Sequence, residues 1–272
     1  MIYRVILSHK QTENIRKFPH DEHTVFVFDD PTPDDIKECD DLGCRYVLMP
    51  SAGHRGMNRN AGLDFILDTF MPSCDDYVEF FDGDRYPTEY NLDTVIHIMK
   101  DCNIDCMLYS CEHDARQQRI FVPLSGATLI DTGTLCNPFY SCGFCMRVGA
   151  IQEVMSFNKG FLFEPRFTMW GGEDQFLGLM CEYLKLRVAI TNETLLNGRV
   201  GGDADQHSDY RESLQTYIDL IREYNIPIRG ESRNFEVLWL DTTVPWQEVG
   251  LYIKAGSFPA FLISVLMSLY KL

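Results

Sequence analysis

The sequence predicts an α/β fold in which helices flank a mostly parallel central sheet. In the first half of the chain, short apolar runs alternate with segments of helical periodicity, as in βαβ units. Acidic residues directly follow several of these runs, at the carboxyl ends of the expected strands, where ligands bind in open parallel sheets. The 272 residues are 45% hydrophobic and 24% charged, which is ordinary for a globular protein and sufficient for a sizeable core. We therefore expect one domain that covers residues 1–272.

The individual elements follow in chain order. Strands are expected at residues 3–8, 24–28, 45–49 and 77–81, with a helix at 59–70 whose N-cap would be Asn58 or Asn60. After these we expect a helix at 89–100, a strand at 105–110, a β-rich stretch through 139–146, a helix at 148–157 and a helical pattern from Glu173. Residues 211–272 are expected to form a C-terminal helical extension.

Asp82 and Asp84 form the most informative motif of the chain. They follow an apolar run with one residue between them, and residues i and i+2 of an extended segment point the same way. Gly83 allows a tight turn, so that both carboxylates can reach one cation. One interpretation is a site for a metal ion and a diphosphate, and the other is a solvated turn at the end of a strand.

A second acidic motif is Trp170-Gly171-Gly172-Glu173-Asp174. The two glycines free the backbone immediately before an acidic pair that opens a helical pattern. Acids at a helix start also complement the helix dipole, so this motif alone leaves both a structural and a functional interpretation open.

The order of these motifs, followed by His207 in a glycine-containing acidic loop, resembles the inverting glycosyltransferases of the GT-A fold. Within them the chain looks like the family 2 class, and its Trp-Gly-Gly-Glu-Asp segment is similar to that of the β-1,4-galactosyltransferases. The resemblance implies a Rossmann-like GT-A sheet, with residues 1–110 as the nucleotide-sugar-binding half and residues 111–210 as the acceptor-binding and catalytic half.

The resemblance also implies roles for the acidic residues. Mn²⁺ or Mg²⁺ would be bound by Asp84 and His207, with Asp82 acting directly or through water or the ribose. Asp174 would be the general base for the acceptor hydroxyl, and Glu173 would position the acceptor. Trp170 would offer an apolar platform to a sugar ring, although a tryptophan at a loop start is equally often a core residue. A solvated histidine is the alternative for His207.

Two further segments match the donor side of this family. Asp29-Asp30-Pro31 resembles the Asp-Asp-Gly-Ser turn whose acid contacts the nucleotide base; because Pro31 replaces the usual glycine, the choice between Asp29 and Asp30 stays open. The segment from Gly56 to Leu63 is similar to the Ala-Arg-Asn-x-Gly helix start beside the sugar nucleotide, which makes Arg59 a donor-binding candidate. The implied donor is a nucleotide-diphosphate sugar, in the first place a UDP-sugar, and the acceptor a saccharide, glycolipid or glycan.

Charge and cysteine usage exclude other classes. The net charge of −16 argues against a broad nucleic-acid footprint. The ten cysteines have irregular spacing, and the single Cys142-x-x-Cys145 pair has too few ligands for a structural zinc site, so we expect free thiols. The first residues run directly into a strand without a signal peptide, from which we expect a cytoplasmic protein.

The last residues, 258–272, are strongly apolar but shorter than the roughly 20 residues that span a bilayer. This segment could pack on the core, pair with a second subunit or make peripheral membrane contact; the oligomeric state is not predicted.

Three other functions are alternatives to the glycosyltransferase interpretation. A sugar-nucleotide pyrophosphorylase would need a glycine-rich basic loop after the first strand, and residues 8–12 contain no glycine. A glycosidase would use two carboxylates without the nucleotide-side features. An inactive, glycosyltransferase-like binding module would not need the full set of acidic residues.

Overall fold

The computed structural model describes residues 1–9, 12–49, 55–87, 92–111, 120–123, 127–130, 132–133, 139–140, 142–168, 172–198 and 210–227. Within them the strands are β1 (Ile2–Ser8), β2 (Thr24–Asp29), β3 (Arg45–Met49), β4 (Tyr77–Asp82), β5 (Arg85–Pro87), β6 (Cys106–Cys111), β7 (Ile120–Pro123), β8 (Ala127–Ile130), β9 (Gly143–Arg147) and β10 (Val188–Gly198). The helices are α1 (Thr12–Ile15), α2 (Pro33–Leu42), α3 (Arg55–Phe70), α4 (Leu92–Asp101), α5 (Val148–Phe157), α6 (Glu173–Tyr183) and α7 (Tyr210–Glu223).

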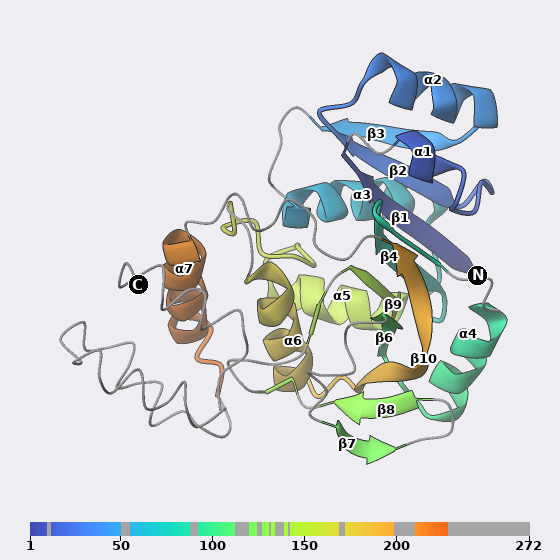
Figure 1. Ribbon diagram of the computed structural model, residues 1–272. Helices are drawn as coiled ribbons and strands as arrows, with labels where there is room; N and C mark the ends of the chain where they lie inside the picture. Colours follow the sequence, from blue (N-terminus) through green and yellow to red (C-terminus); the bar gives the residue numbers. More distant parts are fainter. Residues whose placement is uncertain are drawn as a thin grey trace, which may run out of the picture.

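These strands form one sheet in the order β3-β2-β1-β4-β9-β6-β10-β8-β7, with β5 paired to β10 (Figure 1). The strands β3, β2, β1 and β4 run parallel, and β6 and β10 are also parallel to each other. The antiparallel strand β9 lies between β4 and β6. Most strands therefore run in one direction, and the predicted α/β class with a mostly parallel sheet is confirmed.

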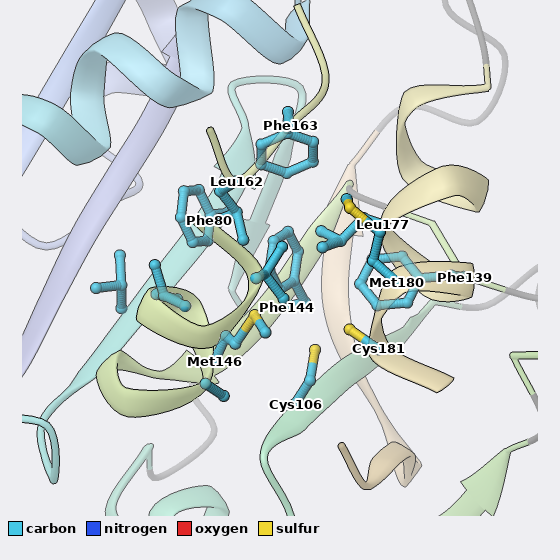
Figure 2. Close-up of a cluster of buried hydrophobic side chains, with 14 of the residues drawn as sticks. Phe80, Cys106, Phe139, Phe144, Met146, Leu162, Phe163, Leu177, Met180 and Cys181 are labelled. Carbon is cyan, nitrogen blue, oxygen red and sulfur yellow. The ribbon is translucent and has the colours of Figure 1, made fainter. Parts of the chain in front are cut away.

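Helices cover both faces of the sheet because side chains along each strand alternate between two apolar clusters. On β1, Val5 joins the cluster formed with α3, α5, α6 and α7, whereas Ile6 joins the cluster formed with α1, α2 and α4. On β4, Phe80 and Phe81 divide in the same way. Figure 2 shows part of the first cluster, where Phe80 from the sheet lies beside Phe163 and Phe144 lies between Phe80 and the side chains of α6.

The start of α3 differs from the expectation. The helix begins at Arg55, so Asn58 and Asn60 lie inside it and neither is the N-cap; both are buried. The side chain of Asn60 instead holds a distant segment: its Nδ2 donates to the carbonyl oxygen of Phe163 at 2.7 Å, and its Oδ1 accepts from the Phe163 amide at 3.0 Å. The side chain of Asn60 therefore makes a tertiary contact with Phe163 and does not cap the helix.

Several elements were not expected from the sequence, among them the short α1 and β5. The acidic helix α2 follows the β2 turn directly, and β10 runs through a polar stretch between β6 and β8 in the sheet. The apolar segment 258–272 lies outside the described residues. Within the described part of the chain, every helix is too short or too polar to cross a bilayer. Cys142 and Cys145 are free thiols, as expected.

Candidate active site at the carboxyl edge of the sheet

The candidate site lies where β1, β2 and β4 end. The chain proceeds from β1 through β2 to β3 on one side and then returns to β4 on the other side of β1. Such a change of direction leaves a crevice beyond the carboxyl ends of the strands, which is the usual ligand site of open α/β sheets. Asp29 ends β2 and Asp82 ends β4, and Asp84 follows in the turn before β5. The sheet therefore brings the predicted donor-side acids to one edge.

Arg59 is the residue that links Asp82 to the rest of the site. It projects from α3, and only 1% of its surface is exposed. Its Nη2 donates to Asp82 Oδ1 at 2.6 Å, and its guanidinium lies 5.2 Å from the centre of the Phe163 ring. Arg55, one helical turn earlier, places its Nη1 3.8 Å from Asp82 Oδ2. The Asp82 carboxylate is thus surrounded by positive charge from the first turns of α3.

The same guanidinium reaches the second acidic motif. Arg59 Nη1 lies 3.7 Å from Glu173 Oε1, at the first residue of α6. This approach is close because Gly56 has no side chain: a Cβ there would lie 3.2 Å from Phe163 Cβ and 3.7 Å from Glu173 Cβ. Arg59 therefore stands between Asp82 of β4 and Glu173 of α6, and the two motifs share one site.

Asp174 is the next residue of α6 and has a different environment. Its Oδ1 accepts from the backbone amide of Gln175 at 2.9 Å, and Gln175 in turn accepts from the Gly172 amide at 3.2 Å. Burial and then the charge of Glu173 raise the pKa of Asp174 to about 7, against the lowering effect of Arg59 and of backbone hydrogen bonds. A carboxylate with a pKa near neutrality can exchange a proton under physiological conditions.

Asp84 is half-buried beside Asp82. Burial and then the charge of Asp82 raise its pKa, against the opposing effect of Arg85 and Arg55. A nearby cation would relieve both unfavourable effects, and carboxylate oxygens are ligands that Mn²⁺ and Mg²⁺ prefer. No group of three or more metal-ligating side chains occurs within the described residues. The donor chemistry at Asp84 fits a divalent cation that takes its remaining ligands from elsewhere.

The other predicted residues have mixed outcomes. Trp170 and His207 lie outside the described residues. Asp29 is buried at the end of β2, whereas Asp30 is exposed and has a left-handed backbone with φ 54°. His9 was not predicted: its Nδ1 lies 2.9 Å from the carbonyl oxygen of Asp29, at the same edge of the sheet. Because His9 directly follows the first expected strand, its place in the sequence could have indicated that it lies at the carboxyl edge of the sheet. Arg55 was not among the predicted site residues, and its approach to Asp82 depends on α3 beginning earlier than expected.

Comparisons with known proteins agree on the fold. No protein-family model matches the chain, and no curated protein matches its sequence. Residues 1–349 of S. aureus TarS in complex with UDP-GlcNAc match with a TM-score of 0.56 and 17% identity, over 86% of this chain and 69% of that chain. Glucosyl-3-phosphoglycerate synthase from Mycobacterium tuberculosis, with Mn²⁺, UDP and glucosyl-3-phosphoglycerate, matches with a TM-score of 0.50 and 14% identity, over 85% and 82% of the two chains.

A third match is GalNAc-T7 with UDP, GalNAc and Mn²⁺, with a TM-score of 0.53 and 12% identity, over 83% of this chain and 49% of that chain. All three are glycosyltransferases that have the GT-A fold. At these identities the likeness concerns the fold alone, and the chain shares the α/β architecture of the matched structures.

Proposed function

We propose that this protein is a metal-dependent inverting glycosyltransferase that transfers a sugar from a nucleotide-diphosphate sugar, in the first place a UDP-sugar, to an acceptor hydroxyl. The observation that carries the proposal is the position of Arg59 between Asp82 and Glu173. It unites a donor-side acidic turn and an acceptor-side acidic pair in one crevice. The UDP and Mn²⁺ of the matched glycosyltransferases support the choice of donor and metal.

On the donor side, Asp84 would be the direct metal ligand, with His207 as a further ligand. A bound Mn²⁺ or Mg²⁺ would neutralise charge on the departing diphosphate. Asp82 would contact the metal through water, or contact the ribose, because Arg59 donates to one of its oxygens and Arg55 faces the other. Asp29 and Asp30 are the candidates for contact with the nucleotide base, since they follow β2 at the same edge.

On the acceptor side, Asp174 would accept the proton of the acceptor hydroxyl. The acceptor oxygen would attack the anomeric carbon from the face opposite the diphosphate, a new glycosidic bond would form, and the bond to the diphosphate would break. The anomeric configuration would invert. The raised pKa of Asp174, about 7, suits a general base that works near neutral pH.

Glu173 would orient the acceptor by accepting a hydrogen bond from it. Its Oε2 is buried and has no hydrogen-bond partner within the described residues. A buried carboxylate oxygen in that condition is costly, and a donor hydroxyl from an acceptor would satisfy it. Trp170, two residues before Gly172, would stack on the acceptor, which we expect to be a saccharide, glycolipid or glycan.

The test is a panel of nucleotide sugars incubated with the protein, with Mn²⁺ and with a chelator, and read by released nucleoside diphosphate. We expect release from one donor with Mn²⁺ and loss of release with the chelator. Donor binding without release, in the presence of a broad acceptor mixture, would favour the inactive binding module. Formation of a nucleoside triphosphate from added pyrophosphate would favour the pyrophosphorylase.

A further inference from the structure

Helix α7 packs against the beginning of α6, the helix that carries Glu173 and Asp174 (Figure 1). The contact is a cluster of three aromatic rings. Tyr217 of α7 lies 6.5 Å from the ring centre of Phe167 and 6.3 Å from that of Phe176, and these two rings are 6.1 Å apart. All three side chains are at least nine-tenths buried.

Phe167 is the member of the cluster that touches the acidic motif. Gly172 is the N-cap of α6, and a Cβ built on it would lie only 2.7 Å from Phe167 Cε1. The Phe167 ring therefore rests directly on the Gly172 backbone, one residue before Glu173. Contacts run without interruption from Tyr217 through Phe167 to the backbone that sets the direction of Glu173 and Asp174.

A second set of contacts fixes the other end of α7 to the same segment. Glu223, the last residue of α7, binds Lys159 at 2.6 Å and also pairs with Arg166, the residue before Phe167. Arg166 Nε in turn donates to the buried Glu164 at 2.8 Å. Tyr224 donates to Asn158 at 3.0 Å. These contacts hold α7 in place but do not reach Gly172.

We infer that Tyr217 is a positioning residue for the acidic pair, acting through Phe167 and Gly172. In its absence, Phe167 would be free to shift and the first turn of α6 would lose its support. This inference rests on the proposed function, because the displaced group that matters is the general base. A displacement of about 1 Å in a catalytic group can lower turnover about 10²-fold.

The test compares Tyr217→Leu with Tyr224→Leu. Both rings contact Phe176, at 6.3 and 5.9 Å, but of the two only Tyr217 contacts Phe167 within the described residues. Leucine keeps an apolar side chain at each site. We expect Tyr217→Leu to lower kcat at least about tenfold with donor KM unchanged, because the described donor residues lie on α3 and at or just after the ends of β2 and β4. Tyr224→Leu should leave kcat near the wild-type value. Equal effects of both variants on kcat, or an effect of Tyr217→Leu on donor KM alone, would overturn the inference.

A measurement without turnover separates this inference from the proposed function. The Phe176 amide donates to the Gly172 carbonyl at 2.9 Å in the first turn of α6, and its hydrogen–deuterium exchange reports that turn. We expect faster exchange at Phe176 in Tyr217→Leu than in Tyr224→Leu. If the wild type turned over no nucleotide sugar, the proposed function would fail, but this difference in exchange would still support the link from α7 to α6. Equal exchange in both variants would refute the link.

Discussion

Gly172→Ala is the substitution that most directly tests how the acidic pair is held. Gly172 has φ 97° and ψ −27°, a region that residues with a Cβ rarely adopt. An alanine there pays a backbone cost of about 1–3 kcal/mol. The new methyl group also overlaps Phe167, with 2.7 Å to its Cε1 and 3.2 Å to its Cδ1. Phe167 is buried against two other rings and cannot simply swing away, so the overlap adds about 1–3 kcal/mol.

Gly160 is a matched control for the backbone cost. Its φ is 98°, nearly the same as that of Gly172, but a Cβ at this position meets no atom within 4 Å. Gly160→Ala should therefore lose only the backbone contribution, about 1–3 kcal/mol. The difference between the two variants isolates the overlap with Phe167. Because Gly160 lies before the acidic motif and outside its contacts, its variant should keep the wild-type kcat.

Urea denaturation followed by circular dichroism gives the two free energies of unfolding, and kcat is measured on the same preparations. We expect Gly172→Ala to be less stable than Gly160→Ala by about 1–3 kcal/mol, and to lose about 10²-fold in kcat because α6 must move. Equal free energies of unfolding for the two variants would mean that the Phe167 ring can move away from the new methyl group at little cost. A normal kcat in Gly172→Ala would show that the position of the α6 start does not control the chemistry.

Four further predictions concern the acidic residues and His207. Asp84→Ala should abolish Mn²⁺-dependent binding of UDP in calorimetry while circular dichroism stays unchanged, since the residue lies in a half-buried turn; undiminished binding would remove Asp84 from the metal site. His207→Ala should weaken the same binding less than Asp84→Ala does, and full activity at limiting Mn²⁺ would assign His207 to solvent. Asp174→Asn should lower kcat by about 10²–10⁴-fold with donor affinity nearly unchanged, and NMR of the wild-type product should show inversion; a normal kcat or retention of configuration would overturn the mechanism. Because burial and Glu173 raise the pKa of Asp174 to about 7, and the base works when ionised, wild-type kcat should fall as pH drops below about 7 and level off above it. A profile that is flat from pH 5 to 8 would contradict this assignment.

The strands of the donor side could be predicted from sequence because their apolar runs are short, β-rich and bounded by polar residues. The helix α2 was missed although its signal is local. Thr32 accepts from the Asp35 amide, Asp35 accepts from the Thr32 amide, and Pro33 occupies the first helical position. A capping box followed by proline is a recognised helix start. The sequence interpretation treated Asp29-Asp30-Pro31 as a donor-side turn and did not use the capping residues that follow it, so the helix was overlooked.

The position of β10 in the sheet could not be predicted from local sequence in the same way. Its middle residues are polar, and its pairing changes along its length from β8 and β6 to β5, with register shifts against β6. A strand whose partners change lacks the regular alternation that sequence patterns detect. Its end is nevertheless informative for the site, because Gly198 pairs with Arg85, next to Asp84. The proximity of β10 to the turn that carries Asp84 is visible in the folded structure but not in the sequence.

The proposed division of roles between Glu173 and Asp174 also depends on the fold. The sequence presents two adjacent acids, and successive residues of a helix point about 100° apart, so at most one can face a given partner. Glu173 faces Arg59, which remains charged at any physiological pH and also binds Asp82. Asp174 accepts instead from the Gln175 backbone, and burial together with the Glu173 charge raises its proton affinity. The buried arginine thereby distinguishes two chemically similar carboxylates: the one that faces it suits acceptor orientation, and its neighbour, with the higher proton affinity, suits proton transfer.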